Sequence, residues 1–193
     1  FFTESTADGW NRQDYYFDER EWKADGYAGI SHAALGIGTD ETNLTNDPEA
    51  TTGLVSNFFA GVADSDGFNS DDATAASPYI ADLLKFYMPA VDHALVNGPD
   101  DGDAGVITDF NVEHLGGFEF YPRMFKGDLD ALMEVAMSTT GGTESIAEGI
   151  AAYQQTQVNN IAAELALDPD NLDLRNELRD TLQKGAALQG FAE

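Results

Sequence analysis

The chain has 193 residues, enough for one domain of ordinary size, and its 42% hydrophobic content is too high for a disordered polyelectrolyte. Its 35 Asp and Glu against nine Lys and Arg give a formal net charge of -26. So few basic residues cannot form a basic patch, which excludes nucleic acid as a partner and predicts repulsion from an anionic membrane surface. Cysteine is absent, which excludes disulfides, thiolate catalysis and cysteine-ligated metals.

The acidic residues run along the whole chain, which favours a generally acidic surface over a local acidic binding tail. Such a net charge destabilises a compact state by self-repulsion, and salt removes the penalty because the screening length falls from about 10 Å at 0.1 M to about 3 Å at 1 M. With more Asp than Glu and few Lys, the composition resembles that of proteins from extremely halophilic archaea. This resemblance implies an environment of molar salt and carries no particular family, fold or site.

Residues 1–20 are rich in aromatic side chains and show no clear period, so we expect an irregular arm ahead of a single helical domain over residues 21–193. Such an arm packs on its own body or reaches a neighbouring molecule. Because the chain begins at Phe1 and not at Met, we expect that a leader was removed and the protein exported. No apolar run of about 18 residues is present, so we expect no membrane insertion. The candidate interface residues are Phe1, Phe2, Trp10, Tyr15, Tyr16 and Phe17.

The N-terminal half shows helix signals separated by polar segments. Apolar side chains at helical spacing predict a helix over residues 19–37, and a polar loop is expected over residues 38–47. Asp47 as the N-cap and Pro48 as the first helical residue predict the start of the next helix.

The middle of the chain is less regular. Ser77-Pro78 is expected to start another helix, and Pro89 should kink or divide it. For residues 106–126 a short helix ending at Gly116 is favoured, with one small hairpin as the alternative. An aromatic cluster follows, which we expect to join the core more readily than to line a pocket. Its members are Phe118, Phe120, Tyr121 and Phe125.

The C-terminal third predicts three more helices. One starts at Asp128, and a break over residues 138–142 precedes a capping-box pattern at Ser145 and Glu148. The final helix follows the turn at residues 168–171, and its apolar stripe is expected to contain Leu174, Leu178 and Leu182. Five or six amphipathic helices in all predict an all-α fold, an antiparallel helical bundle.

Two acidic clusters are candidate metal sites, one over residues 64–72 and the other at Glu113 and His114. Alternating Asp, Gly and Asn over residues 64–72 is typical of part of a calcium loop, because hard cations prefer several oxygens from a short turn. The full EF-hand spacing fails: with Gly67 in sixth place, the last position is Ala73 and not Glu. A solvated polar loop therefore remains the alternative, and Ca²⁺ or Na⁺ the expected ion. The candidate ligands are Asp64, Asp66, Asn69, Asp71, Glu113 and His114.

Catalytic signatures are missing from the sequence: it has no GxSxG elbow, P-loop, GxGxxG or HExxH pattern. The first hypothesis is therefore an exported structural or interaction protein of a halophile, found outside the cell or on its surface, that assembles with itself or with another cell-surface protein. A cytoplasmic location in a salt-accumulating halophile is the alternative. The second hypothesis is a helical domain that binds a small ligand or a metal ion, and an enzyme without a recognisable motif comes third.

Overall fold

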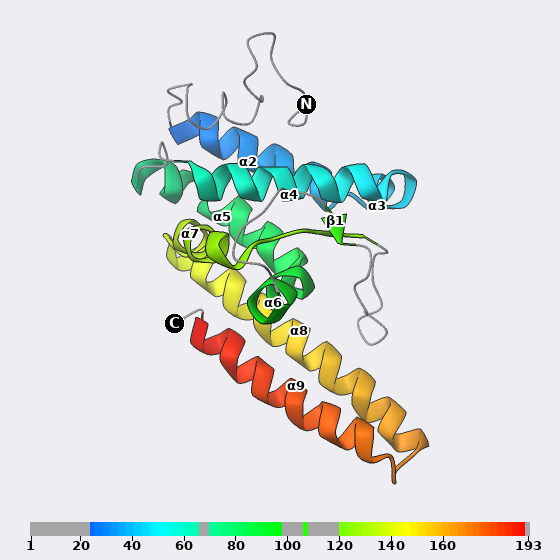
Figure 1. Ribbon diagram of the computed structural model, residues 1–193. Coiled ribbons are helices and arrows are strands. Elements are labelled where there is room, and N and C mark those ends of the chain that lie inside the picture. Colours follow the sequence, from blue (N-terminus) through cyan, green and yellow to red (C-terminus); the bar gives the residue numbers. More distant parts are fainter. Residues whose placement is uncertain (1–23, 66–69, 98–105, 108–119, 192–193) are drawn as a thin grey trace.

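The structure, a computed structural model of the chain, describes residues 24–65, 70–97, 106–107 and 120–191 (Figure 1). These residues form an all-α helical bundle, as predicted, with one small two-stranded ladder. In chain order the elements are α2 (Ala24–Gly38), α3 (Glu41–Asn46), α4 (Pro48–Asp64), α5 (Ser70–Phe86), α6 (Met88–Asn97), β1 (Val106–Ile107), β2 (Tyr121–Pro122), α7 (Lys126–Ala136), α8 (Thr140–Leu167) and α9 (Leu172–Phe191).

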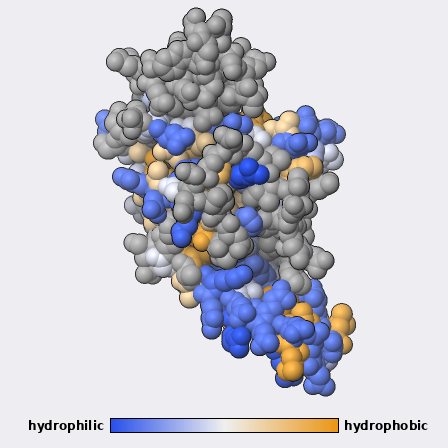
Figure 2. Space-filling model, in the orientation of Figure 1, coloured by the Kyte–Doolittle hydropathy of each residue, from blue (hydrophilic) through white to orange (hydrophobic). Residues whose placement is uncertain are grey.

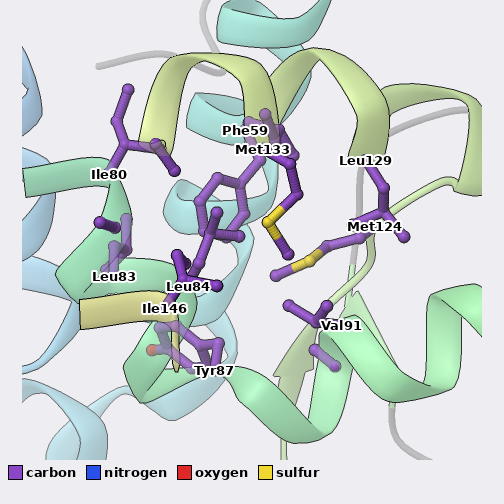
Figure 3. Packing of buried hydrophobic residues seen from close by; sticks show 14 of the residues in the cluster. Phe59, Ile80, Leu83, Leu84, Tyr87, Val91, Met124, Leu129, Met133 and Ile146 are labelled. Atoms are coloured by element: carbon purple, nitrogen blue, oxygen red, sulfur yellow. The ribbon is translucent and has the colours of Figure 1, made fainter. Parts of the chain in front are cut away.

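Helix α5 occupies the centre of the bundle, where it contacts α2, α6, α7 and α8. A helix that is apolar on most sides is expected to be buried among others. Figure 3 shows side chains of four helices converging there, among them Phe59, Leu84, Met133 and Ile146. The fully buried apolar residues of α5 are Ala76, Ile80, Ala81, Leu83 and Leu84.

Two buried hydroxyl groups bind backbone carbonyls of other elements and so fix how α5 and its C-terminal turn meet them. Ser77 donates to the carbonyl of Ala136 over 2.6 Å. Tyr87 donates to the carbonyl of Gly38 over 2.6 Å. A buried hydroxyl without a partner costs about 1–3 kcal/mol, so both bonds oppose any shift of these elements.

The prediction that a helix starts at Ser77-Pro78 is wrong. The helix begins at Ser70, and Pro78 lies inside it. Proline removes a backbone donor, and the loss is tolerated where water can reach the carbonyl one turn earlier. Pro78 and Thr74, the residue one turn earlier, are both exposed.

The polar segment over residues 38–47 is also not a plain loop. It contains the short helix α3, whose N-cap is Asp40: the side chain of Asp40 accepts a hydrogen bond from the backbone N–H of Asn43. Helix α4 begins at Pro48 as predicted, but Asp47 makes no side-chain capping bond. Asp47 is therefore the N-cap residue of α4, as predicted, but only its backbone contributes there.

Pro89 divides the apolar segment, as predicted. Helix α5 ends at Phe86, and α6 begins two residues later, at Met88. The carbonyl of Tyr87 accepts from the backbone N–H groups of Ala90 and Val91. Proline cannot donate to the preceding turn, so the chain starts a new helix here.

Strands β1 and β2 pair in antiparallel register, with Ile107 opposite Tyr121. This ladder fits the hairpin alternative. The residues for which the short helix ending at Gly116 was favoured, 108–116, lie outside the described residues. The aromatic cluster joins the core as expected at Tyr121 and Phe125, which are buried. Phe120 is half-buried, and Phe118 lies outside the described residues.

The capping-box prediction at Ser145 is wrong. Helix α8 begins at Thr140, and its N-cap is Thr139, whose side chain accepts from the backbone N–H of Gly142. The side chains of Ser145 and Glu148 instead bind α5, at Asp82 and Lys85. Helix α7 likewise starts at Lys126, two residues before the predicted position.

Helices α8 and α9 form a long hairpin that projects from the body of the bundle (Figure 1). Helix α8 has 28 residues, a length of about 42 Å. Helix α9 makes its main contacts with α8. Gln154 of α8 packs directly on Gly185 of α9, where a methyl group would collide with the amide.

The seam between α8 and α9 uses different residues from those predicted. Leu174 and Leu178 are half-buried, as expected for the stripe, but Leu182 is 59% exposed. The seam continues through Thr181 and Gly185 and ends at Leu188, which is buried. The spacing of three and four residues is that of a coiled-coil seam.

Candidate functional site

The predicted calcium loop is divided between two helices. Asp64 is the last residue of α4, and Asp71 lies in the first turn of α5. Both are exposed, while Asp66 and Asn69 lie outside the described residues. Within the parts of the chain that the structure describes, no three His, Asp or Glu side chains are grouped to hold a metal ion. The cation loop therefore remains a prediction.

Asp64 has a carboxylate neighbour that local spacing did not indicate. It is Asp128, in the first turn of α7. Burial, and secondarily the charge of Asp64, raise the pKa of Asp128 to about 6. Two carboxylates that repel each other in this way form a pair which a cation or a proton relieves. A pair alone supplies too few oxygens for a calcium site.

The other predicted site residues cannot be placed. Glu113 and His114 lie outside the described residues. The same holds for the aromatic arm, that is, for Phe1, Phe2, Trp10, Tyr15, Tyr16 and Phe17.

Two shallow hollows adjoin each other on the body. One, of about 360 Å³, lies between the α5–α6 junction and α8, and the other, of about 390 Å³, lies between α2 and α5. Lys85 and Phe86 line both of them. These volumes are within the usual range for small-molecule sites, about 300–1,000 Å³.

The polar side chains that line the hollows already have partners. Lys85 donates to Glu148 over 2.7 Å, and Asp82 accepts from Ser145 over 2.6 Å. Thr39, just after α2, donates to the carbonyl of Leu35 in that helix, and Thr156 donates to the carbonyl of Ala152 in α8. Polar groups that fix a ligand must be able to turn toward it, and here they are already engaged, so the first hollow offers mainly apolar contact.

Tyr153 lines the first hollow. Its hydroxyl donates to Asp92 over 2.8 Å and accepts from Gln157 over 3.0 Å. Burial, and then the charge of Asp92, raise the pKa of Tyr153 far above its ordinary value. The phenol is therefore held neutral and acts as a hydrogen-bond donor in the structure, not as a base.

The projecting hairpin carries exposed leucines at and near its free end. Leu167 is 88% exposed and Leu172 is 68% exposed, one on each side of the connecting turn. Figure 2 shows apolar surface gathered at this end of the molecule, next to hydrophilic residues of the hairpin. Single exposed leucines are ordinary, but several together on an element with few other contacts indicate an interaction surface.

One side of the hairpin also lacks acidic residues. The stretch over residues 149–163 has no charged side chain, and α9 carries as many basic as acidic ones. Helical spacing places one stripe of each helix next to the seam, on the same side of the hairpin. We call this surface the alanine–leucine face. It consists of the exposed residues Ala151, Gln155, Ala162, Ala166, Arg175, Leu182 and Ala186.

Comparison with known proteins adds no relative: no family model, no curated protein and no solved structure matches this chain. None of the helices in the described part of the chain is both long and apolar enough to cross a membrane. The candidate sites therefore rest on the geometry above.

The exposed surface of the hairpin was not predicted from the sequence, because Leu182 was assigned to the buried stripe of the last helix. A signal was present in the residues around it. Thr181 and Gly185 continue the spacing of Leu174 and Leu178, and small residues at these positions allow α8 and α9 to approach closely.

Proposed function

We propose that this chain is a structural or interaction protein of a halophile, which works by docking and not by catalysis. The observation that supports this proposal is the α8–α9 hairpin, which projects from the body and exposes Leu167, Leu172 and Leu182. The large exposed apolar side chains among the described residues lie mostly on this hairpin, with Ile37 as the exception. Apolar surface on a projecting element is typical of a protein–protein contact.

The net charge of -26 supports the choice of a very salty environment. In molar salt the screening length is about 3 Å, so acidic molecules can approach one another closely. The partner is a second copy of this chain or another cell-surface protein. An extracellular or cell-surface location is part of the proposal, and the cytoplasm of a salt-accumulating cell is the alternative.

The experiment is size fractionation of a native extract of the producing cells, kept at the salt concentration of growth and probed with an antibody against the chain. We expect the chain in the surface or medium fraction, in an assembly larger than the 20.8 kDa monomer. A chain that elutes at the monomer mass from every fraction would contradict an interaction role. Recovery only from the cytoplasmic fraction would contradict the location.

A second candidate function is the binding of a small ligand or a cation, and the hollows around Lys85 and the Asp64–Asp128 pair favour it. Thermal melting at constant ionic strength tests the cation directly. Replacing part of the KCl by millimolar CaCl₂, or by NaCl, should raise the melting temperature of the wild type but not of Asp64→Asn. An unchanged melting temperature in both ions would remove the cation proposal.

A further inference from the structure

We propose that the partner of the hairpin is a second copy of this chain, which docks its own alanine–leucine face so that α8 and α9 of both copies form an antiparallel four-helix bundle. This inference rests on the docking function proposed above and names its partner. Four observations support it: the few contacts of α9, the exposed apolar side chains, the charge distribution, and the size of the face.

Helix α9 leaves much of its surface exposed. Helix α9 makes its main contacts with α8, so most of its circumference is not used by the body of the bundle. Leu182 stands near the midpoint of α9 and is 59% exposed. Burial of an apolar side chain is favourable, so a partner that covers Leu182 gains free energy.

The side chains around Leu182 permit close packing of two helices. Ala162 and Ala166 of α8 and Ala186 of α9 are exposed on the same face. Helix axes approach to about 8 Å where small side chains meet and to about 10 Å where large ones do. A face of mostly small side chains, with Leu182 near its middle and Gln155 beside the alanines of α8, can therefore fit against a copy of itself.

The distribution of charge favours self-association through this face. Copies that each carry -26 repel each other over most of their surface. The alanine–leucine face has no acidic side chain, and Arg175 binds back to the carbonyl of Pro169 near Asp170. Two such faces can meet without bringing carboxylates together.

Charge also selects the direction of pairing. The acidic bodies lie at one end of each hairpin (Figure 1). Antiparallel pairing places the two bodies at opposite ends of the four-helix bundle, where their repulsion is smallest. It also brings the two Leu182 side chains close to the two-fold axis, because Leu182 is near the middle of α9.

The hairpin is large enough for a stable contact. Two helices of about 10 Å width and 20 residues length present a projected area of about 600 Å². Standard interfaces bury about 800 Å² of accessible surface on each partner, and accessible area exceeds projected area. A symmetric interface that uses the same patch twice is the commonest form of dimer.

The first test is the molar mass of the purified full chain by light scattering in about 3 M KCl, with two matched variants. We expect the wild type to have twice the mass of the 20.8 kDa chain. Ala162→Glu puts a carboxylate on the face and should give the monomer. Ala163→Glu makes the same change on the exposed neighbour, about 100° around the helix, and should remain dimeric. Circular dichroism checks that both variants keep the helical fold.

The second test uses the absence of cysteine from the chain. Under mild oxidation, Leu182→Cys should form a disulfide-linked dimer because the two positions lie near the axis. Leu172→Cys, at the tip, should not, because antiparallel pairing separates the tips. Efficient linkage at Leu172 without linkage at Leu182 would overturn the antiparallel arrangement.

The outcomes separate this inference from the proposed function. A wild type that is monomeric at every salt and protein concentration, or a mass that both glutamate variants change equally, overturns docking of a second copy by this face. If the chain is monomeric alone but is part of an assembly in the native extract, the interaction role stands with a different partner. If it is monomeric in both, the proposed function fails as well.

Discussion

Ser77 is fully buried where α5 meets the turn between α7 and α8. Its hydroxyl donates to the carbonyl of Ala136 and lies 2.9 Å from the hydroxyl of Thr139, the N-cap of α8. Gly142 closes this site from the other side, because any larger residue there would meet Ser77 and Ala136. A single hydroxyl in the middle of α5 therefore connects this helix with the end of α7 and the start of α8.

Gly142→Ala should destabilise the protein. The new methyl group would collide with the carbonyl of Ala136 and the hydroxyl of Ser77, and overpacking of this kind costs about 1–3 kcal/mol. Gly141→Ala is the matched control, since its methyl group would meet nothing within 4 Å. We expect thermal melting in about 3 M KCl to show a clear loss for Gly142→Ala and a change within about 1 kcal/mol for Gly141→Ala. Equal losses would contradict the tight contact.

Asp128 gives a pH prediction. Its pKa is raised from the ordinary 3.8 to about 6, mainly by burial and then by Asp64. The folded state therefore binds a proton more tightly than the unfolded chain, so the contribution of Asp128 to stability is greatest below about pH 4 and is lost as the pH rises through about 6.

Asp128→Asn should accordingly stabilise the protein at pH 7.5, by up to about 1 kcal/mol because water screens a half-buried group. The gain should disappear near pH 4. Melting temperatures of the variant and of Asp130→Asn, an exposed neighbour on α7, give the comparison. A gain for Asp128→Asn that is the same at both pH values would mean that the ionisation of Asp128 is not the cause.

The helices and their inner faces could be predicted from the sequence, whereas several helix ends could not. Apolar spacing marked the core of α5 and α8, because burial selects those residues wherever the helix packs. Helix ends depend on contacts made much later in the chain. Ser145 has the local features of a cap, but its hydroxyl binds Asp82 of α5, 63 residues away in sequence.

The candidate sites show the same limit. Asp64 was predicted as a ligand from its loop, while the carboxyl group on which its charge acts, that of Asp128, comes from a different helix. Thr181 and Leu182 both continue the helical spacing from Leu178, and Leu182 is the more apolar of the two. Only the packing of Gln154 on Gly185 decides which side of α9 faces α8.

The hairpin should be the least stable of the longer elements. Helix α9 makes its main contacts with α8, while α5 is packed by four helices. Local opening costs less where fewer buried contacts are lost. Amide hydrogen exchange in the monomeric Ala162→Glu variant should therefore be faster in α9 than in α5. Exchange of both helices at one common rate would indicate that α9 unfolds only together with the body.

At the scale of the whole molecule, charge is the dominant opposing force. The core that joins α2, α4, α5, α6, α7, α8 and, through Leu188, the C-terminal part of α9 is continuous, so folding has an ordinary apolar driving force. The net charge of -26 works against it by repulsion between carboxylates of the acidic surface. Ion pairs in the described residues offset little of this repulsion, since pairs such as Lys85–Glu148 are largely exposed.

Salt should therefore decide whether the fold is stable. Between about 0.1 M and 2 M KCl the screening length falls several-fold, and the melting temperature should rise steadily. Cosolutes that are excluded from the protein surface also stabilise the folded state, by favouring burial of apolar side chains. Sucrose at equal osmolality is therefore the control, because it favours burial without screening charge. We expect KCl to raise the melting temperature well beyond sucrose. A melting temperature that stays constant in KCl, or that rises equally in sucrose, would mean that charge repulsion does not limit stability and would remove the main support for a halophilic environment.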